Sequence, residues 1–181
     1  MIHEILTRYA EQLNEYLVKI HQSPEGISIV GQIGADNHET PNKLIVSLLN
    51  IERETSSGIS ASISKFNNGS FTKMHPPLML ILNVVLAAVY DSGKYEHSLS
   101  VLSDALAFIQ ANPKFEVDGK SYTIEVVNCT MEYFNNIWTL MGSHSYPSVI
   151  CKIRNLVIDS AEIISGGKTT DKPIVNTNSI N

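Results

Sequence analysis

The sequence predicts an α/β (α+β) fold, with a mixed β-sheet of about five strands flanked by about three helices. Apolar residues recur at helical spacing in three segments, and five other segments are rich in β-branched residues. The two kinds alternate in the order helix, two strands, loop, strand, helix, strand, helix, strand. With 181 residues, 43% of them hydrophobic, the chain is expected to form one domain with a sizeable core.

The first helix is predicted over residues 1–20. Its apolar side chains recur every three or four positions and its charged side chains occupy the other side. The apolar set is Ile2, Ile5, Leu6, Tyr9, Leu13, Leu17 and Ile20. Ser23 and Pro24 end this helix, and a strand is predicted at 27–33.

Two long central strands are predicted next, at 43–54 and 78–90. In the first, both alternating sets of side chains are apolar, which is typical of a strand covered on both faces near the middle of a sheet. The second is the most hydrophobic run of the chain. It is thirteen residues long, whereas a membrane-spanning helix needs about 20.

Two polar stretches interrupt this pattern. Residues 55–73 are rich in Ser and Asn, which favours either a mobile or functional loop or an extended hairpin arm built on the alternating ISASIS. Residues 165–181 have the composition of an extended tail. We expect this tail to lie along a neighbouring chain, with Ile174 and Val175 paired at a strand edge, and the domain itself to span 1–164.

The second half predicts two helices and two strands. In the first of these helices the expected apolar stripe is Tyr95, Leu99, Leu102, Leu106 and Ile109. A strand at 122–127 is expected to place Tyr122, Ile124 and Val126 on its buried face. The other helix runs from an N-cap at Thr130 to a stop at Gly142, and a strand follows at 148–158.

The chain's single tryptophan lies in the last helix. Phe134, Ile137, Trp138 and Met141 share one face there, so we expect Trp138 to join the helix to the sheet. The expected structural anchors of this region are Phe134, Trp138, Met141, Gly142 and Pro147.

Composition argues against several functions. The net charge is −5 and the basic residues are scattered, which argues against nucleic-acid binding. The six histidines form no HxH or HExxH motif and no Cys/His pair at ligand spacing, so no metal or cofactor is expected. Cys129 and Cys151 each lie beside an apolar run and are interpreted as core thiols. The first residues do not form a secretory signal.

One alternative involves chemistry. Glu52 and Glu54 lie two residues apart on a strand and share a face, as acid/base pairs sometimes do, and His144 lies in a polar turn. A small α/β binding or hydrolytic domain using these three residues is therefore the alternative function. Lys152 and Arg154 also share a face, and the two acids could instead pair with these two bases, across strands or between subunits.

Four phrases carry a resemblance to a known family: MIHEILTRYAEQLNEYL, LIVSLLNIERE, YEHSLSVLSDALAFIQANPKF and FNNIWTLMGSHSYPSVICKIRNLVI. Together they resemble the tail terminator or cap proteins of phage-tail-like contractile injection systems, the antifeeding-prophage class, once catalogued as a domain of unknown function. The resemblance runs from residue 1 to about 160. The last phrase is its most distinctive part.

The resemblance implies a structural, non-enzymatic bacterial protein. Its subunits would form a hexameric ring that ends the inner tube and connects it to the sheath and to a cap or adaptor, without direct membrane insertion. Assembly would take place in the cytoplasm, in a particle that is released, anchored to a membrane or kept in the cell. The residues expected at interfaces are Glu52, Arg53, Glu54, Lys152, Arg154, Ile174 and Val175.

Overall fold

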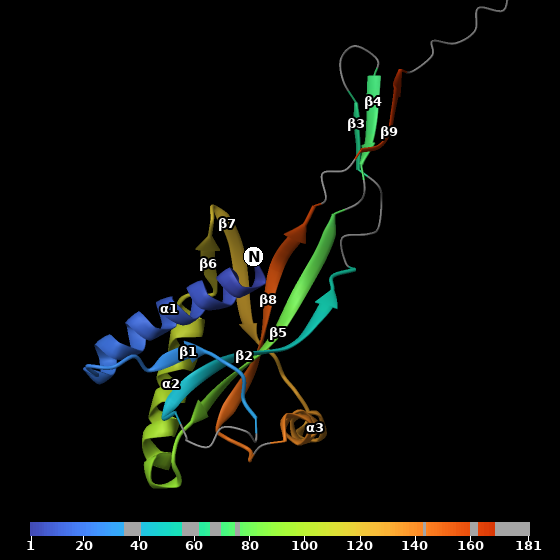
Figure 1. Cartoon of the computed structure of the whole chain (residues 1–181). Helices are drawn as coiled ribbons and strands as arrows, with labels where there is room; N and C mark the ends of the chain where they lie inside the picture. The colour runs from blue at the N-terminus through green and yellow to red at the C-terminus, as the bar shows by residue number, and fades with distance from the viewer. Residues whose placement is uncertain are drawn as a thin grey trace, which may run out of the picture. The chain divides into compact units, whose positions relative to one another are not determined.

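The computed structural model describes residues 1–34, 41–55, 62–65, 70–74, 77–142, 144–159 and 163–168. The chain divides into two compact units. The first comprises Met1–Arg53 and Leu80–Leu156, and the second comprises the described parts of 54–79 and 157–181. The first unit holds a six-stranded sheet in the order β1-β2-β5-β8-β7-β6. Helices α1 and α2 cover one face of this sheet, and α3 covers part of the other (Figure 1).

The α+β class and the order of the predicted elements are confirmed. The helices are α1 (Ile2–His21), α2 (Tyr95–Ala111), which follows a 3-10 turn η1 (Ser92–Lys94), and α3 (Met131–Met141). The strands of the main sheet are β1 (Ser28–Val30), β2 (Lys43–Arg53), β5 (Leu78–Val89), β6 (Lys114–Val117), β7 (Lys120–Val126) and β8 (Ser148–Ile158). The sheet is mixed, because β1 runs parallel to β2 while β2 and β5, β6 and β7, and β7 and β8 are antiparallel.

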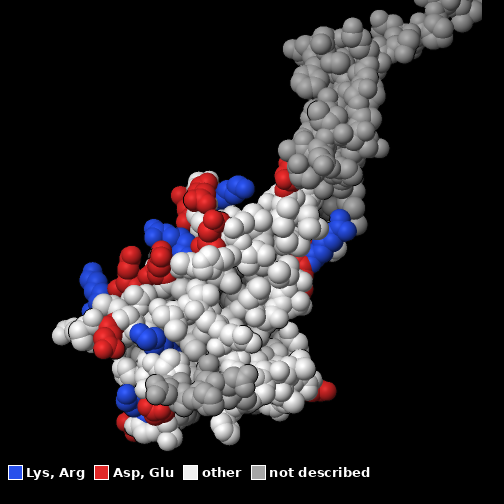
Figure 2. Space-filling model, viewed as in Figure 1, with Lys and Arg blue, Asp and Glu red and all other residues white. Residues whose placement is uncertain are grey.

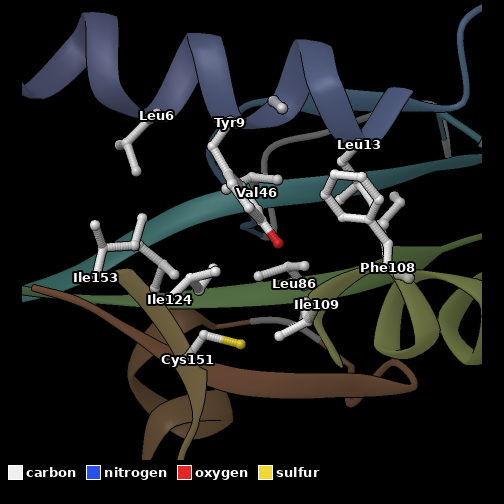
Figure 3. Close-up of a cluster of buried hydrophobic side chains, with 14 of the residues drawn as sticks. Leu6, Tyr9, Leu13, Val46, Leu86, Phe108, Ile109, Ile124, Cys151 and Ile153 are labelled. Carbon is white, nitrogen blue, oxygen red and sulfur yellow. The ribbon is translucent and has the colours of Figure 1, made fainter. Parts of the chain in front are cut away.

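Helix α1 packs its predicted apolar side chains against the sheet. Ile5, Tyr9, Leu13 and Leu17 are each no more than 1% exposed. Figure 3 shows Leu6, Tyr9 and Leu13 pointing from the helix toward apolar side chains of the strands. The helix also fixes the first strand, because the Asn14 side-chain oxygen accepts hydrogen bonds from the backbone N–H groups of Ile27 (2.7 Å) and Ser28 (3.0 Å).

The apolar stripe predicted for α2 is largely wrong. The buried residues of this helix are Ser98, Val101, Ala105, Phe108 and Ile109, whereas Tyr95, Leu99 and Leu106 are 56%, 41% and 38% exposed. The small side chains of Ser98 and Ala105 allow the helix to lie close to its neighbours. Only Ile109, at the end of the predicted stripe, is fully buried, because the helix is rotated relative to the expected orientation.

The hairpin of β6 and β7 was only half predicted, which explains why the sheet has one strand more than expected. Lys114 pairs with Thr123 and Val117 with Lys120, so the loop has two residues. These are Asp118 and Gly119, with φ of 51° and 73°. Asp-Gly with two positive φ angles is the sequence that a tight hairpin turn prefers, and this signal marked the missing strand. Val126, expected on the buried face, is 45% exposed at the end of β7.

Strand β2 is covered on both faces over only part of its length. Leu44, Ile45 and Val46 are at most 2% exposed, as the pattern predicts, but Leu48 and Ile51 are 37% and 41% exposed. The change coincides with the end of β1, which pairs only with 44–46, and with a bulge between Leu48 and Asn50. The second half of β2 therefore differs from the central strand that the sequence predicts.

The second unit contains three short strands. They are β3 (Ser62–Lys65), β4 (Ser70–Met74) and β9 (Ile163–Lys168), which form an antiparallel sheet in the order β3-β4-β9. The segment at 55–73 thus contains a hairpin, one of the two alternatives left open by its sequence. Ile174 and Val175 lie outside the described residues, so their pairing remains a prediction.

The two cysteines have different environments. Cys151 is fully buried, as expected, but Cys129 is exposed, so the prediction of a core thiol is wrong there. Cys129 lies in the connection between β7 and α3, beyond the last residue that pairs with β8. Among the described helices, none has the length and apolar character that a bilayer span needs.

Candidate functional site

Helix α3 is held in place at both ends. The Thr130 hydroxyl accepts a hydrogen bond from the Tyr133 backbone N–H (3.2 Å), which is an N-cap. At the other end Gly142 has a φ of 63°, and its N–H donates to the carbonyl oxygen of Thr139 (3.1 Å). A glycine suits this position because a side chain would strain the left-handed conformation. Both boundaries follow the sequence signals.

The inner side of α3 packs on the sheet through Trp138. This side chain is 4% exposed and belongs to a small core with Ile45, Val85, Ala87 and Val89. Phe134 and Tyr146 flank it, with ring centroids 6.2 and 5.8 Å from the Trp138 ring. Met141 packs against the same core. Pro147 accepts a hydrogen bond at its carbonyl oxygen from the Ala88 N–H (2.9 Å), which joins the start of β8 to β5.

A second apolar stripe on α3 is exposed at its two ends and buried at its middle residue, Ile137. Tyr133, Ile137 and Leu140 have the i, i+4, i+7 spacing of one helix face. Leu140 is 88% and Tyr133 is 47% exposed. With Ile33, Leu48 and Leu49 they line a groove of about 530 Å³ between α3 and β2, which we call the lateral groove. Its remaining lining residues are Gln32, Ser47, Asn50, Asn136 and Met141.

The lateral groove carries no charged residue in its lining. Figure 2 shows charged side chains gathered over α1 and the β6–β7 hairpin, whereas the surface over α3 is mostly uncharged. Helix α3 has one acidic residue in its first turn, Glu132, and no basic residue in its last turn. An exposed apolar patch of this kind is typical of surfaces that bind other proteins.

Beside the groove, the edge of β2 has no strand paired with it among the described residues. The pairing of β1 with β2 ends at Val46, whose carbonyl oxygen accepts from Gly31 N–H (3.2 Å). Farther along, Glu54 N–H donates to Met79 on the β5 side. By the two-residue alternation of a strand, Ile51 N–H therefore points to the opposite edge, where it donates to the Asn50 side chain (2.8 Å). We call the β1 side of residues 47–53 the open edge.

The predicted charged residues Glu52, Lys152 and Arg154 lie in one cluster, on the sheet face that α3 partly covers. Lys152 Nζ lies 3.3 Å from a carboxylate oxygen of Glu52. Arg154 Nε lies 2.7 Å from a carboxylate oxygen of Glu125, and Glu125 is directly opposite Lys152 in the strand register. The side-chain charges therefore alternate in sign along the cluster, in the order Glu52, Lys152, Glu125 and Arg154. Between 26% and 54% of each of these side chains is exposed, so each ion pair is worth roughly 1 kcal/mol or less.

The structure does not bring together the residues of the hydrolytic alternative. His144 lines a different hollow, with Ala88, Tyr90 and Pro147, whereas Glu52 is opposite Ile81. Ile81 and Ala88 are seven residues apart on β5, a separation of roughly 23 Å at about 3.3 Å per residue. Glu52 and His144 are therefore too far apart to act on one bond. Arg53, the last residue of β2, is also exposed.

Buried titratable groups lie in the core rather than around the groove. Burial raises the pKa of the Cys151 thiol to about 12, and burial together with the neighbouring Cys151 raises the pKa of Tyr9 above its ordinary range. Both groups are therefore protonated at neutral pH. Within the described parts of the chain, no group of three or more His, Cys, Asp and Glu side chains is arranged to hold a metal ion.

A larger hollow lies away from the lateral groove, between α1, α2 and the β6–β7 hairpin. Its volume is about 710 Å³, and its lining includes Glu15, Lys19, Lys114 and Glu116. The charges are of both signs, so the hollow does not favour a ligand of either charge.

The lateral groove was not predicted as a site. Its residues were interpreted as core on helical and strand periodicity, which does not distinguish a face covered by the same chain from one left for a partner. One signal was available: α3 has apolar residues on more of its circumference than one sheet contact requires, since Leu140 and Tyr133 lie outside the stripe of Trp138.

Two comparisons with solved structures support the fold. One is the sheath/tube terminator of an extracellular contractile injection system, PVC, in the extended state, with 10% identity, a TM-score of 0.61, and 94% of this chain and 62% of that chain covered. The other is the tube terminating cap of the anti-feeding prophage, with 17% identity, a TM-score of 0.54, and 93% and 59% covered. This chain thus spans about six tenths of each solved chain.

No curated protein sequence matches the chain. The sequence model of the Pvc16 N-terminal domain matches residues 4–171, a range that begins at the third residue of α1 and extends past the end of β9. The earlier resemblance to terminators of contractile injection systems agrees with this match. The chain belongs to the family of the Pvc16 N-terminal domain.

Proposed function

We propose that this chain is a structural, non-enzymatic subunit of a contractile injection system, which ends the inner tube as a hexameric ring and connects it to the sheath and the cap. The observation that carries the proposal is the family match over 4–171. The two solved chains with a similar fold, described as a sheath/tube terminator and a tube terminating cap, support the same role.

A tube built from identical rings needs a different subunit to end its growth. A tube grows by head-to-tail contacts between identical rings, and such contacts continue until a subunit with only one matching face binds. Termination thus requires asymmetric surfaces and no chemistry. This chain has such an asymmetry, since the surface over α3 is apolar and the surface over α1 is charged (Figure 2).

The ring must remain attached while the sheath contracts. We therefore expect interfaces in the obligate range, roughly 2,000 Å² or more per contact. The lateral groove is the first candidate for such a contact, because it leaves Tyr133 and Leu140 exposed in one place. We expect the ring to assemble in the bacterial cytoplasm and to remain with the particle afterwards.

Electron microscopy of particles from cells with and without this chain tests the proposal. Without the chain we expect no particles, or tubes of uncontrolled length with bare ends. Complementation with Leu140→Glu should restore length control poorly, because it places a charge in the apolar groove. Complementation with Glu11→Gln, a change on the charged side of α1, should restore it fully. Normal lengths and normal caps in the absence of the chain would reject the terminator function.

A further inference from the structure

The two edges of the six-stranded sheet are protected very differently. At one edge, β6 is four residues long and alternates charged with apolar residues, Lys114 and Glu116 with Phe115 and Val117. Short, charged edge strands are a common defence against unwanted pairing. At the other edge, β1 covers only three residues of β2 and leaves the open edge beside it.

The open edge has the features of a strand acceptor. Its residues Ser47 to Ile51 are uncharged, and apolar side chains lie on both faces of the strand. Leu48 and Ile51 lie opposite Val84 and Leu82 of the core under α1 and α2 and are 37% and 41% exposed. On the other face, Leu49 packs against the core under α3 and lines the lateral groove. A strand added along this edge would cover side chains on both faces, since its successive side chains point to opposite faces.

We propose that the open edge and the lateral groove bind residues 169–181 of a second copy of this chain as an added β-strand. The proposal rests on the proposed ring, because it supplies a link between neighbouring subunits. The segment follows β9, which ends at Lys168. It has thirteen residues and contains two adjacent β-branched residues, Ile174 and Val175.

The chemistry of this segment matches that of the groove. From Pro173 to Asn181 it has no charged side chain, and the groove lining has none either. Pro173 lies directly before the apolar pair, a position at the start of a strand where its missing N–H is tolerated. One of Ile174 and Val175 would enter the groove beside Leu140, and the other would cover Ile51 on the opposite face.

The segment is longer than the open edge. Thirteen residues extend over roughly 43 Å at about 3.3 Å per residue, and the seven residues 47–53 of the open edge over roughly 23 Å. Such an added strand would extend the sheet. It would make backbone hydrogen bonds with the open edge in addition to the apolar contacts in the groove. Docking in the same chain would cover the edge but would join no subunits, so the ring favours docking between copies.

Mixing single-cysteine proteins tests the proposal directly. Cys129 is exposed and is first replaced in all proteins by Cys129→Ser, while Cys151 is buried, with a pKa raised to about 12, and does not need replacement. One protein then carries Leu140→Cys and the other Val175→Cys, and a short bismaleimide is added to the mixture. We expect covalent heterodimers. The matched control replaces Leu140→Cys by Glu11→Cys on the charged side of α1 and should give at least tenfold less product.

Two results would overturn the proposal. The first is the absence of heterodimers above the control level. The second is cross-linking only within single chains that carry both Leu140→Cys and Val175→Cys. Independently, the chain without residues 169–181 should associate at least tenfold more weakly in sedimentation velocity, with an unchanged unfolding midpoint; equally strong association would also overturn it. Neither measurement depends on tube length, so failure here and failure of the terminator function remain distinguishable.

Discussion

Helices α1 and α3 lie on opposite faces of one sheet and use their apolar residues differently. Helix α1 buries six side chains, from Ile5 to Leu17, and presents charged residues to solvent. Helix α3 buries only Ile137 and Trp138 and leaves Met131, Tyr133 and Leu140 74%, 47% and 88% exposed. The apolar periodicity of α1 therefore serves the fold alone, whereas that of α3 serves both the fold and an exposed surface.

The largest contrast is expected from equivalent leucine substitutions on the two helices. Leu17 is fully buried, so Leu17→Ala should lower the free energy of unfolding by about 3 kcal/mol through lost contacts and a residual cavity. Leu140→Ala should change it by less than about 0.5 kcal/mol, because the side chain is 88% exposed. Urea unfolding followed by circular dichroism measures both. Comparable losses of unfolding free energy in the two variants would show that the Leu140 side chain is buried in the folded chain.

The cysteines provide the next contrast, since Cys151 lies in the core under α1 and Cys129 precedes α3. Burial raises the pKa of Cys151 to about 12, whereas in the unfolded chain this thiol titrates near 9. Its contribution to stability is therefore complete below pH 9 and is lost as the pH rises from 9 to 12. Relative to Cys151→Ala, the free energy of unfolding of the wild type should fall by about 3 kcal/mol between pH 8 and pH 11.

A thiol reagent provides the control for this titration. At pH 8 the native chain should expose one reactive thiol, Cys129, and the unfolded chain two. A pH dependence identical in the wild type and in Cys151→Ala would contradict the burial of the thiol. Tyr90, whose pKa burial also raises to about 12, contributes in the same way to both proteins.

The smallest effect is expected from the ion pairs on the sheet face that α3 leaves uncovered. A double-mutant cycle of Glu52→Gln and Lys152→Met should give a coupling energy of roughly 0.2–1 kcal/mol, because both side chains are partly exposed. Charge reversal is a poorer probe, since Lys152 is directly opposite Glu125 and a new acid there would be repelled. A coupling energy above about 2 kcal/mol would show that a partner protein buries this cluster.

Most of the fold follows from local patterns. The ends of α3 were predicted because Thr130 and Gly142 are specific cap residues. The orientation of α2 was not, because Leu99 and Leu106 have the same spacing as a buried stripe, and only the packing of Ser98 and Ala105 decides which face turns inward. Strand β6 was missed although its Asp118-Gly119 turn was in the sequence.

The candidate site was predicted less well than the fold. The alternating charges did indicate the pairing of Glu52 with Lys152, but Arg154 pairs with Glu125, a residue that no pattern singled out. The lateral groove depends on where β1 stops and where α3 lies above β2. Both are results of tertiary packing, which a single sequence does not specify.

The most direct test of the account is an elongation assay with purified inner tubes. Tube subunits are added in the presence of this chain, and electron microscopy records the tube lengths and the density at each end. We expect extra density at one end of each tube and arrested growth there, and we expect that the Leu140→Glu variant does not arrest growth. Binding along the tube wall, or continued growth at both ends, would contradict the proposed terminator function.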